Sequence, residues 1–337
     1  MASSVVVMPK PEFDPRMLQL LTEIYKREPA IRNEQDVYRY FAGFGQVDAD
    51  LEDLLELMQE LEKIRSQFEF GSNLQAARKK LPVALQEVLA VSENRASRQE
   101  TNFANGYLSE FFYIYLPKAY SCEAKARVAI HVTEPYVKNA SRVARALASC
   151  QATLHSFKVA GPAQAGRTDQ IIAYLCSAED LAVVEKGLTD SNTADCVGGV
   201  VPPAMKEIRP GLGFAEEPPN VPTSYVTVGG VTSKNLHKYD QKTHPLVKTD
   251  AGFAPKNNQR MSFGEFHAHR IWAGLVQWRD KYSGTSNQTI RFHRFLYEVY
   301  LAYGRKRVDL KTPYLFPARE STLAEWRTDY FMKNRKA

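Results

Sequence analysis

The sequence predicts an α+β protein, with a helical N-terminal region followed by a mixed, largely antiparallel sheet flanked by helices. Residues 16–110 carry apolar side chains mainly at spacings of three and four, which is typical of amphipathic helices. Residues 124–176 instead read as strand, helix, strand, loop and strand, and strong helical patterns return after residue 262. We therefore divide the chain into a helical region, 1–104, and an α+β domain, 105–337.

The clearest helix of the N-terminal region is expected to follow a capping aspartate, Asp48 or Asp50. Apolar residues then recur along one face of the segment, while Glu, Lys and Arg fill the other: Leu51, Leu54, Leu55, Met58 and Leu61. A further helix is expected over residues 74–89. This region either packs as a layer on the α+β domain or docks a peptide or partner protein, and the pattern leaves both open.

The segment 124–176 contains the residues of greatest interest. Its first strand alternates an apolar side with a side that carries Arg127 and His131. An amphipathic helix over 135–150 follows, and then a strand that contains Lys158. A loop rich in Gly and Pro leads to Arg167 and the next strand, which can pair antiparallel with the strand before it. Two cations, Lys158 and Arg167, thus flank one loop.

The remaining elements are less uniform. The aromatic run over 105–118 fits a strand or a short buried helix. Residues 197–222 contain so many prolines and glycines that we expect no regular structure through most of them. A helix is expected from Ser262, with Glu265 completing a capping box, and another over 287–304.

Composition indicates a globular chain, with 44% hydrophobic residues and a modest formal charge of +6. The basic residues form no dense block, so we expect no nucleic-acid partner. No apolar run is long enough for a membrane span, and no Sec-type signal peptide is evident, so a cytoplasmic protein is expected. The four cysteines show neither zinc-site nor disulfide-framework spacing, which predicts reduced thiols and no metal.

The cations suggest phosphate chemistry without deciding it. Arginine suits bidentate binding of phosphate, and a lysine near other cations loses its proton readily. His267, His269 and Arg270 lie near the start of a helix that could approach the strands. The two histidines are two positions apart, so they should point to different faces. Any one of these residues taken alone is also compatible with a structural role.

Several blocks, taken in order, resemble the HopA-like family: ARVAIHV, FKVAGP with GRTDQIIAYL, VPPAMKEIRPGLGFAEEPP and SFGEFHAHRIWAGL. That family includes type III effectors of plant pathogens and stand-alone lyases of lanthipeptide and thioamitide gene clusters. The resemblance covers roughly residues 107–304. More distantly, the FKVAG block resembles the OspF/SpvC phosphothreonine lyases, which eliminate phosphate without a metal or cofactor and whose fold we expect in the sheet domain.

The resemblance implies roles for individual residues. Lys158 matches the general base that removes the substrate Cα proton. Arg127, Arg167 and Arg270 match phosphate-binding positions, and Lys206 is expected to add a further phosphate contact. Where those lyases keep their histidine acid, this chain has Ala129. His131, on the same strand face, is one expected substitute, and His267, His269 and Tyr174 are the alternatives.

The resemblance implies a carbon–oxygen lyase that converts phosphoserine or phosphothreonine of a precursor peptide to a dehydroamino acid. It would need no cofactor and would work beside a kinase-like phosphotransferase. The alternatives are a type III effector that is secreted into a host cell and binds host proteins, and a phosphopeptide-binding module without turnover.

Overall fold

A computed structural model describes residues 11–43, 47–68, 71–72, 108–109, 111–116, 122, 124–177, 180–218, 246–249, 252–255, 262–282, 287–304 and 308–316. The chain folds as two compact units. The first comprises Met1–Phe41 and Pro218–Ala318, and the second comprises Ala42–Glu217 and Arg319–Ala337.

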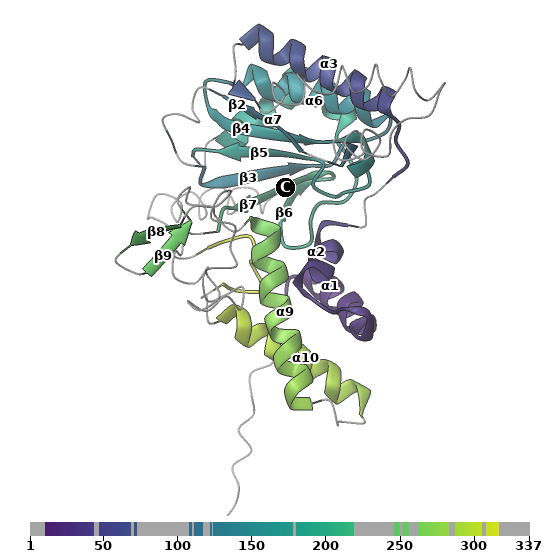
Figure 1. Ribbon diagram of the computed structural model, residues 1–337, viewed down its shortest axis with the longest axis vertical. Coiled ribbons are helices and arrows are strands. Elements are labelled where there is room, and N and C mark those ends of the chain that lie inside the picture. The colour runs from purple at the N-terminus through teal and green to yellow at the C-terminus, as the bar shows by residue number, and fades with distance from the viewer. Residues whose placement is uncertain are drawn as a thin grey trace, which may run out of the picture. The chain divides into compact units, whose positions relative to one another are not determined.

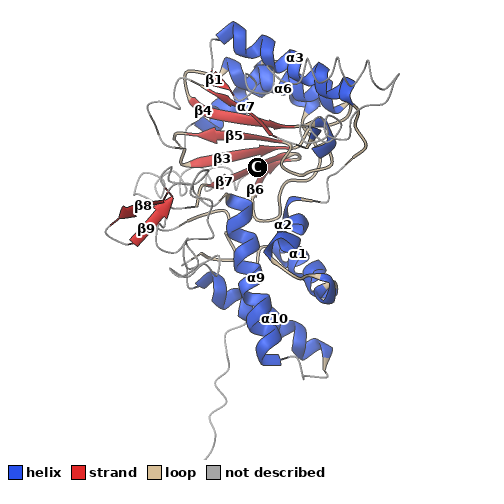
Figure 2. Ribbon diagram, in the orientation of Figure 1, coloured by secondary structure: helices blue, strands red, loops and turns tan. Residues whose placement is uncertain are grey.

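The second unit is built on a seven-stranded sheet in which all the pairs between described strands are antiparallel. Figure 2 shows these strands as neighbouring arrows. Their order across the sheet is β1-β2-β4-β5-β3-β7-β6. The bounds are β1 Gly71–Ser72, β2 Phe111–Tyr115, β3 Ala126–Ile130, β4 Leu154–Ala160, β5 Ile171–Leu175, β6 Lys206–Arg209 and β7 Leu212–Glu216. The predicted α+β class and largely antiparallel sheet are confirmed.

The predicted strand–helix–strand segment forms a split unit. Helix α6, Tyr136–Ser149, connects β3 to β4, and β5 lies between these two strands and pairs antiparallel with both. β3 and β4 therefore run in the same direction, as the strands of a β-α-β crossover do. The apolar residues that the helical spacing placed on one side of α6 are all buried: Val137, Ala140, Val143, Ala144 and Leu147.

One face of the sheet packs against α3, Leu51–Phe68, α6 and α7, Asp180–Asp190. Figure 1 shows α3 and α6 on the same side of the strands. Alternate residues of the inner strands form this core together with the apolar stripes of the helices: Phe112, Ile114, Val128, Ile130, Phe157, Val159, Ile171, Ala173, Leu212 and Phe214. Because strand side chains alternate between faces, the intervening residues of these strands belong to the other face.

The N-terminal region is helical, as predicted, with α1 Pro15–Lys26, α2 Glu34–Ala42 and α3. Leu54, Leu57 and Leu61 of α3 are fully buried in the core of the sheet unit. This helix therefore packs as a layer on the sheet. The helix expected over 74–89 and the domain boundary expected at 104 lie outside the described residues, so that domain division stays a prediction.

Two segments differ from or refine the sequence-based expectation. The aromatic run forms a strand, β2, whose outward and inward residues alternate. Residues 197–222 were expected to lack regular structure through most of their length, and the part of them that is regular is the β6–β7 hairpin. Gly211 makes the turn possible, because its φ is +76° and a Cβ there would lie 2.5 Å from the Gly198 nitrogen. The glycine that suggested irregularity is thus the residue that the hairpin turn requires.

The first unit contains α1, α2, the hairpin β8 Leu246–Thr249 with β9 Gly252–Pro255, and the helices α9 Phe263–Tyr282 and α10 Gln288–Gly304. The predicted capping box opens α9: the Ser262 backbone N–H donates to Glu265, 2.8 Å, and the Glu265 N–H donates to the Ser262 hydroxyl, 3.3 Å. Among the described helices, none is both long and apolar enough to span a bilayer.

Phe157 is fully buried between β4 and the helices, so Phe157→Ala should lower the free energy of unfolding of the sheet unit by about 3–5 kcal/mol. Urea denaturation followed by circular dichroism measures this change. The matched control Val200→Ala removes a side chain that is 65% exposed, and it should shift stability by less than about 0.5 kcal/mol. Equal effects of the two substitutions would contradict the assignment of the core.

Candidate functional site

The sheet face opposite the helices carries a cluster of charged and aromatic side chains. The register places Tyr113 of β2 opposite Lys158 of β4, and Tyr174 of β5 opposite Arg127 of β3. Because neighbouring residues in register project from the same face, these four side chains share one surface. The structure thus brings together the predicted base, Lys158, and the predicted phosphate ligand, Arg127.

Lys158 lies against aromatic rings of the neighbouring strand. Its Nζ is 4.0 Å from the centroid of the Phe111 ring and 5.6 Å from that of Tyr113. Burial lowers the pKa of Lys158 to about 8; Asp169 and Glu217 oppose this change, and Arg127 and Arg167 add to it. At pH 7 about a tenth of Lys158 is therefore the neutral amine, which is the form that can accept a proton, compared with less than about 0.1% for an ordinary lysine.

Arg127 is almost completely buried and is held by a bidentate ion pair with Glu217, in which Nη2 lies 2.8 Å from Oε2. Its guanidinium carbon lies 5.3 Å from the centroid of the Tyr174 ring. Burial works against the charge of Arg127, but Glu217 and Tyr174 more than offset this, and the pKa of Arg127 is raised. For Tyr174, whose charged form is the phenolate, burial raises the pKa and so keeps the phenol protonated.

Arg167 lies on the loop between β4 and β5 and is held by a second bidentate pair. Its Nε and Nη2 lie 2.7 and 3.0 Å from the two carboxylate oxygens of Asp169. Its guanidinium carbon is 5.2 Å from the centroid of the Phe111 ring, the ring that Lys158 also contacts. The two cations predicted to flank this loop therefore meet over one aromatic side chain.

The loop itself is anchored at several points. The Gln170 side chain is buried, accepts a hydrogen bond from the Val132 N–H and donates one to the Ala165 carbonyl. The Tyr136 hydroxyl donates to the Ala160 carbonyl over 2.6 Å. These bonds fix Arg167 beside the end of β3. A loop this well anchored can hold a charged group in one geometry.

His131 directly follows β3, and the backbone of Arg167 lies near enough to influence the charge of its imidazole. Its Nδ1 is buried without a hydrogen-bond partner among the described residues. Burial lowers the pKa of His131, and the influence of the Arg167 backbone and of Glu134 only partly compensates. His131 is thus next to a member of the cluster, whereas Ala129 lies on the cluster face with no group to donate a proton.

Lys206 is not brought to this cluster. It lies on β6, at one edge of the sheet, in register with Phe214, whose side chain belongs to the helix-covered core. The alternation of the strands therefore places Lys206 on the face opposite Lys158. A phosphate contact from Lys206 at this cluster is not supported by that position.

His267, His269 and Arg270 all lie on α9 in the first unit. His267 is fully buried, stacks on Phe41 and bonds the Tyr303 hydroxyl through Nδ1, 2.9 Å. His269 bonds Glu34 over 2.8 Å. The histidines thus face different neighbours, as their spacing predicts, and these contacts give His267 a structural function within its own unit. Its catalytic role and the phosphate-binding role of Arg270 stay predictions.

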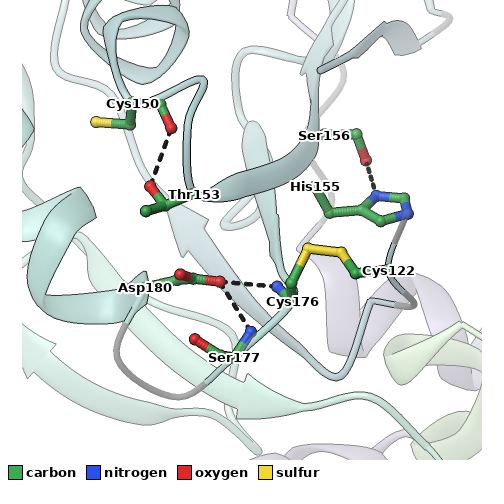
Figure 3. The surroundings of a disulfide bond; sticks show 8 residues. All are labelled: Cys122, Cys150, Thr153, His155, Ser156, Cys176, Ser177 and Asp180. Atoms are coloured by element: carbon green, nitrogen blue, oxygen red, sulfur yellow. Dashed lines mark hydrogen bonds between the residues drawn. A yellow bond between two sulfur atoms is a disulfide. The ribbon is translucent and has the colours of Figure 1, made fainter. Parts of the chain in front are cut away.

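The expectation of four reduced thiols is wrong for one pair. Cys122 and Cys176 form a disulfide with a Cα–Cα distance of 5.9 Å (Figure 3), and Cys150 and Cys196 are free and buried. The two bonded cysteines are 54 positions apart, a spacing that carries no framework signal in sequence. The bond joins the chain before β3 to the end of β5. Next to it, the Asp180 carboxylate accepts from the N–H groups of Cys176 and Ser177.

Four residues of the cluster were not singled out by sequence. Glu217 and Asp169 hold the arginines, and Phe111 and Tyr113 lie against Lys158. Asp169 stands two positions from Arg167, a spacing that could have drawn attention to it. Glu217 is 90 positions from Arg127, and only the fold reveals that pair. Within the described part of the chain, no group of three or more His, Cys, Asp or Glu could hold a metal ion.

The chain is similar to effector proteins in one segment of its sequence and in its fold. Residues 103–227 match the model of the HopA1 effector protein family, and this match confirms the resemblance predicted from the sequence. The match includes Arg127, Lys158, Arg167 and Glu217. A search of curated proteins found no match.

Two solved structures share the fold. One is the effector protein from Pseudomonas syringae pv. tomato strain DC3000, with a TM-score of 0.50 and 17% identity, covering 89% of this chain and 96% of that one. The other is the effector protein from Pseudomonas syringae pv. syringae strain 61, with a TM-score of 0.52 and 16% identity, covering 89% and 97%. At these identities the likeness concerns the fold.

The disulfide predicts the number of reactive thiols. Denatured but unreduced protein should expose two thiols to a thiol-specific chromophoric reagent, from Cys150 and Cys196, and reduced protein should expose four. The Cys176→Ser variant should lower the free energy of unfolding by about 2–4 kcal/mol relative to the oxidised protein, because the cross-link constrains the unfolded chain. Four thiols in the unreduced protein would refute the bond.

Lys158 should become reactive at an unusually low pH. In the folded protein, its labelling by a trace amine-acylating reagent should be half-maximal near pH 8. In urea-unfolded protein the midpoint should move to about 10.4, the ordinary lysine value. Peptide mapping by mass spectrometry measures both curves. Identical midpoints in the folded and unfolded states would show that the cluster does not perturb this amine.

Proposed function

We propose that this protein is a phosphoserine or phosphothreonine lyase that converts phosphorylated residues of a peptide to dehydroalanine or dehydrobutyrine. The observation that carries the proposal is the position of Lys158, a lysine with a pKa of about 8 that shares a sheet surface with Arg127 and the Phe111 ring with Arg167 of the next loop. β-Elimination of phosphate needs a base to remove the Cα proton and cations to stabilise the departing phosphate, and a neutral amine beside two arginines can supply both.

In the proposed reaction, Arg127 and Arg167 bind the phosphate and stabilise the charge that develops on it as it leaves. Lys158 takes the Cα proton, the electrons of that C–H bond form the Cα–Cβ double bond, and the Cβ–O bond breaks. Lys158 ends protonated and the phosphate carries the oxygen away. A proton for the leaving oxygen comes from the acid, for which His131, beside Arg167, is the candidate within the sheet unit.

A second function, phosphopeptide binding without turnover, is favoured by one specific feature. Ala129 occupies the position where the related lyases keep their acid, and it lies on the cluster face in register with Ile172 and Gly213. A site that lacks its acid would retain the arginines for binding. Such a module would suit a HopA-like effector that binds phosphorylated host proteins after secretion.

The lyase function implies a cellular setting. The substrate would be a ribosomally made precursor peptide, and a kinase-like phosphotransferase would supply the phosphoserine or phosphothreonine that the lyase consumes. No cofactor enters the proposed chemistry. Under this proposal the protein works in the producing cell, whereas the effector alternative places its activity in a host cell.

Incubation of wild-type protein with a phosphothreonine peptide should produce a loss of about 98 Da, the mass of phosphoric acid, in the peptide mass spectrum. The rate should be greatest between the lowered pKa of His131 and the pKa of Lys158, about 8, and should fall on both sides, because elimination needs protonated His131 as the acid and neutral Lys158 as the base.

The variant Lys158→Met keeps the length of the side chain without the amine, so it should lose elimination by at least about 100-fold and still bind the phosphopeptide. A Lys138→Met control changes an exposed lysine on α6 and should leave the rate unchanged. Phosphopeptide binding with no mass loss by the wild type would favour the module without turnover. Undiminished turnover by Lys158→Met would remove Lys158 from the mechanism.

A further inference from the structure

The negative charge of Asp169 lies among the three cations of the cluster. Its carboxylate pairs with Arg167 through both oxygens. It also stabilises the charged forms of Lys158 and Arg127, and it is the largest influence that opposes the fall in the Lys158 pKa. Asp169 thus interacts with the groups to which the proposed function assigns the substrate phosphate.

The charges of these side chains limit what the cluster can bind. When Lys158 is neutral, the guanidinium groups of Arg127 and Arg167 are balanced by the carboxylates of Glu217 and Asp169. While both ion pairs are intact, a phosphate dianion meets net positive charge only when Lys158 is protonated, which is the form that cannot act as a base. Once the phosphate displaces a carboxylate, the freed arginine can bind it whether or not residue 158 carries a charge. Asp169 therefore weakens the attraction of the cluster for anions and lowers the fraction of Lys158 that is neutral. Elimination needs both anion binding and a neutral Lys158.

The same carboxylate has a compensating effect on geometry. Arg167 lies on a loop, and a free arginine there would have many rotamers, whose restriction on binding costs free energy. The bidentate pair holds its guanidinium in one orientation above the Phe111 ring. The side chains of Arg167 and Asp169 are only 12% and 17% exposed, so solvent competes weakly for the pair.

We propose that Asp169 is a positioning residue that orients Arg167 for the substrate phosphate and sets the net charge around Lys158. This inference rests on the proposed phosphate site, which it deepens by naming the group that controls it. Glu217 forms a comparable pair with Arg127, but it directly follows β7 and its backbone N–H is bonded to the Lys125 carbonyl, 2.9 Å. Asp169, on the loop, is the partner that a substrate can displace.

Two substitutions separate the effects of charge and orientation. Asp169→Asn keeps an oxygen that can accept from Arg167 but removes the charge. The labelling midpoint of Lys158 should then fall by about one pH unit, and a phosphothreonine peptide should bind about tenfold more tightly in isothermal titration calorimetry at pH 7.5. Asp169→Ala removes the acceptor as well, so its labelling midpoint should fall similarly while its binding is weaker than that of Asp169→Asn.

Asp190→Asn is the matched control, because Asp190 pairs with Lys186 at the exposed end of α7; it should change neither measurement. An unchanged Lys158 midpoint and unchanged binding in Asp169→Asn would overturn the proposal, as would equal binding by the Asn and Ala variants. These readouts need no turnover, so a protein that binds but never eliminates would refute the lyase function while leaving the role of Asp169 standing.

Discussion

The arrangement of this site depends on the register of four antiparallel strands. β2, β4, β5 and β3 are paired so that Lys158, Arg127, Tyr113 and Tyr174 project from one face, while the alternate residues pack on α3, α6 and α7. A slip of one residue would exchange the two faces. It would bury lysine and arginine against the helices and expose phenylalanine and isoleucine. The apolar core that stabilises the fold thus also fixes where the charges lie.

The charges are in turn balanced locally. Each of the two arginines of the cluster, one on the sheet face and one on the adjoining loop, is held by a bidentate carboxylate, Glu217 for Arg127 and Asp169 for Arg167. Breaking a buried pair by removing one partner leaves an uncompensated charge, which is costly. The cluster therefore meets two opposed requirements. Its carboxylates must neutralise the arginines while no ligand is bound, and at least one arginine must become available to bind an anionic ligand.

Local patterns predicted much of the fold. Alternation identified β3 and helical spacing identified α6, because both depend on residues close in sequence. The pattern did not identify the hairpin within residues 197–222, because its turn depends on tertiary contact. The glycines and prolines there suggested mainly irregular chain, yet Gly211 forms the β6–β7 turn close to Gly198. The aromatic run over β2 was undecided until its pairing with β4 fixed it as a strand.

The site was predictable to the extent that its cations lie in one short segment. Lys158, Arg127 and Arg167 come together as the order of strands and loop implied. Of the two carboxylates that hold the arginines, Asp169 is only two positions from Arg167, but Glu217 is 90 positions from Arg127 and meets it because β7 pairs with β3. The disulfide of Cys122 and Cys176 likewise joins positions whose separation carries no signal in sequence. Lys206 was assigned to the site because it lies in one of the sequence blocks of the resemblance. The register of β6 with β7 instead places it on the opposite face of the sheet from Lys158.

The most direct test of the account is the crystal structure of the Lys158→Met variant bound to a phosphothreonine peptide. The account predicts that the phosphate lies between the guanidinium groups of Arg127 and Arg167, with the Cα hydrogen of the phosphothreonine directed at the side chain of residue 158. A phosphate bound elsewhere on the protein, with both arginines still paired to Glu217 and Asp169, would contradict it.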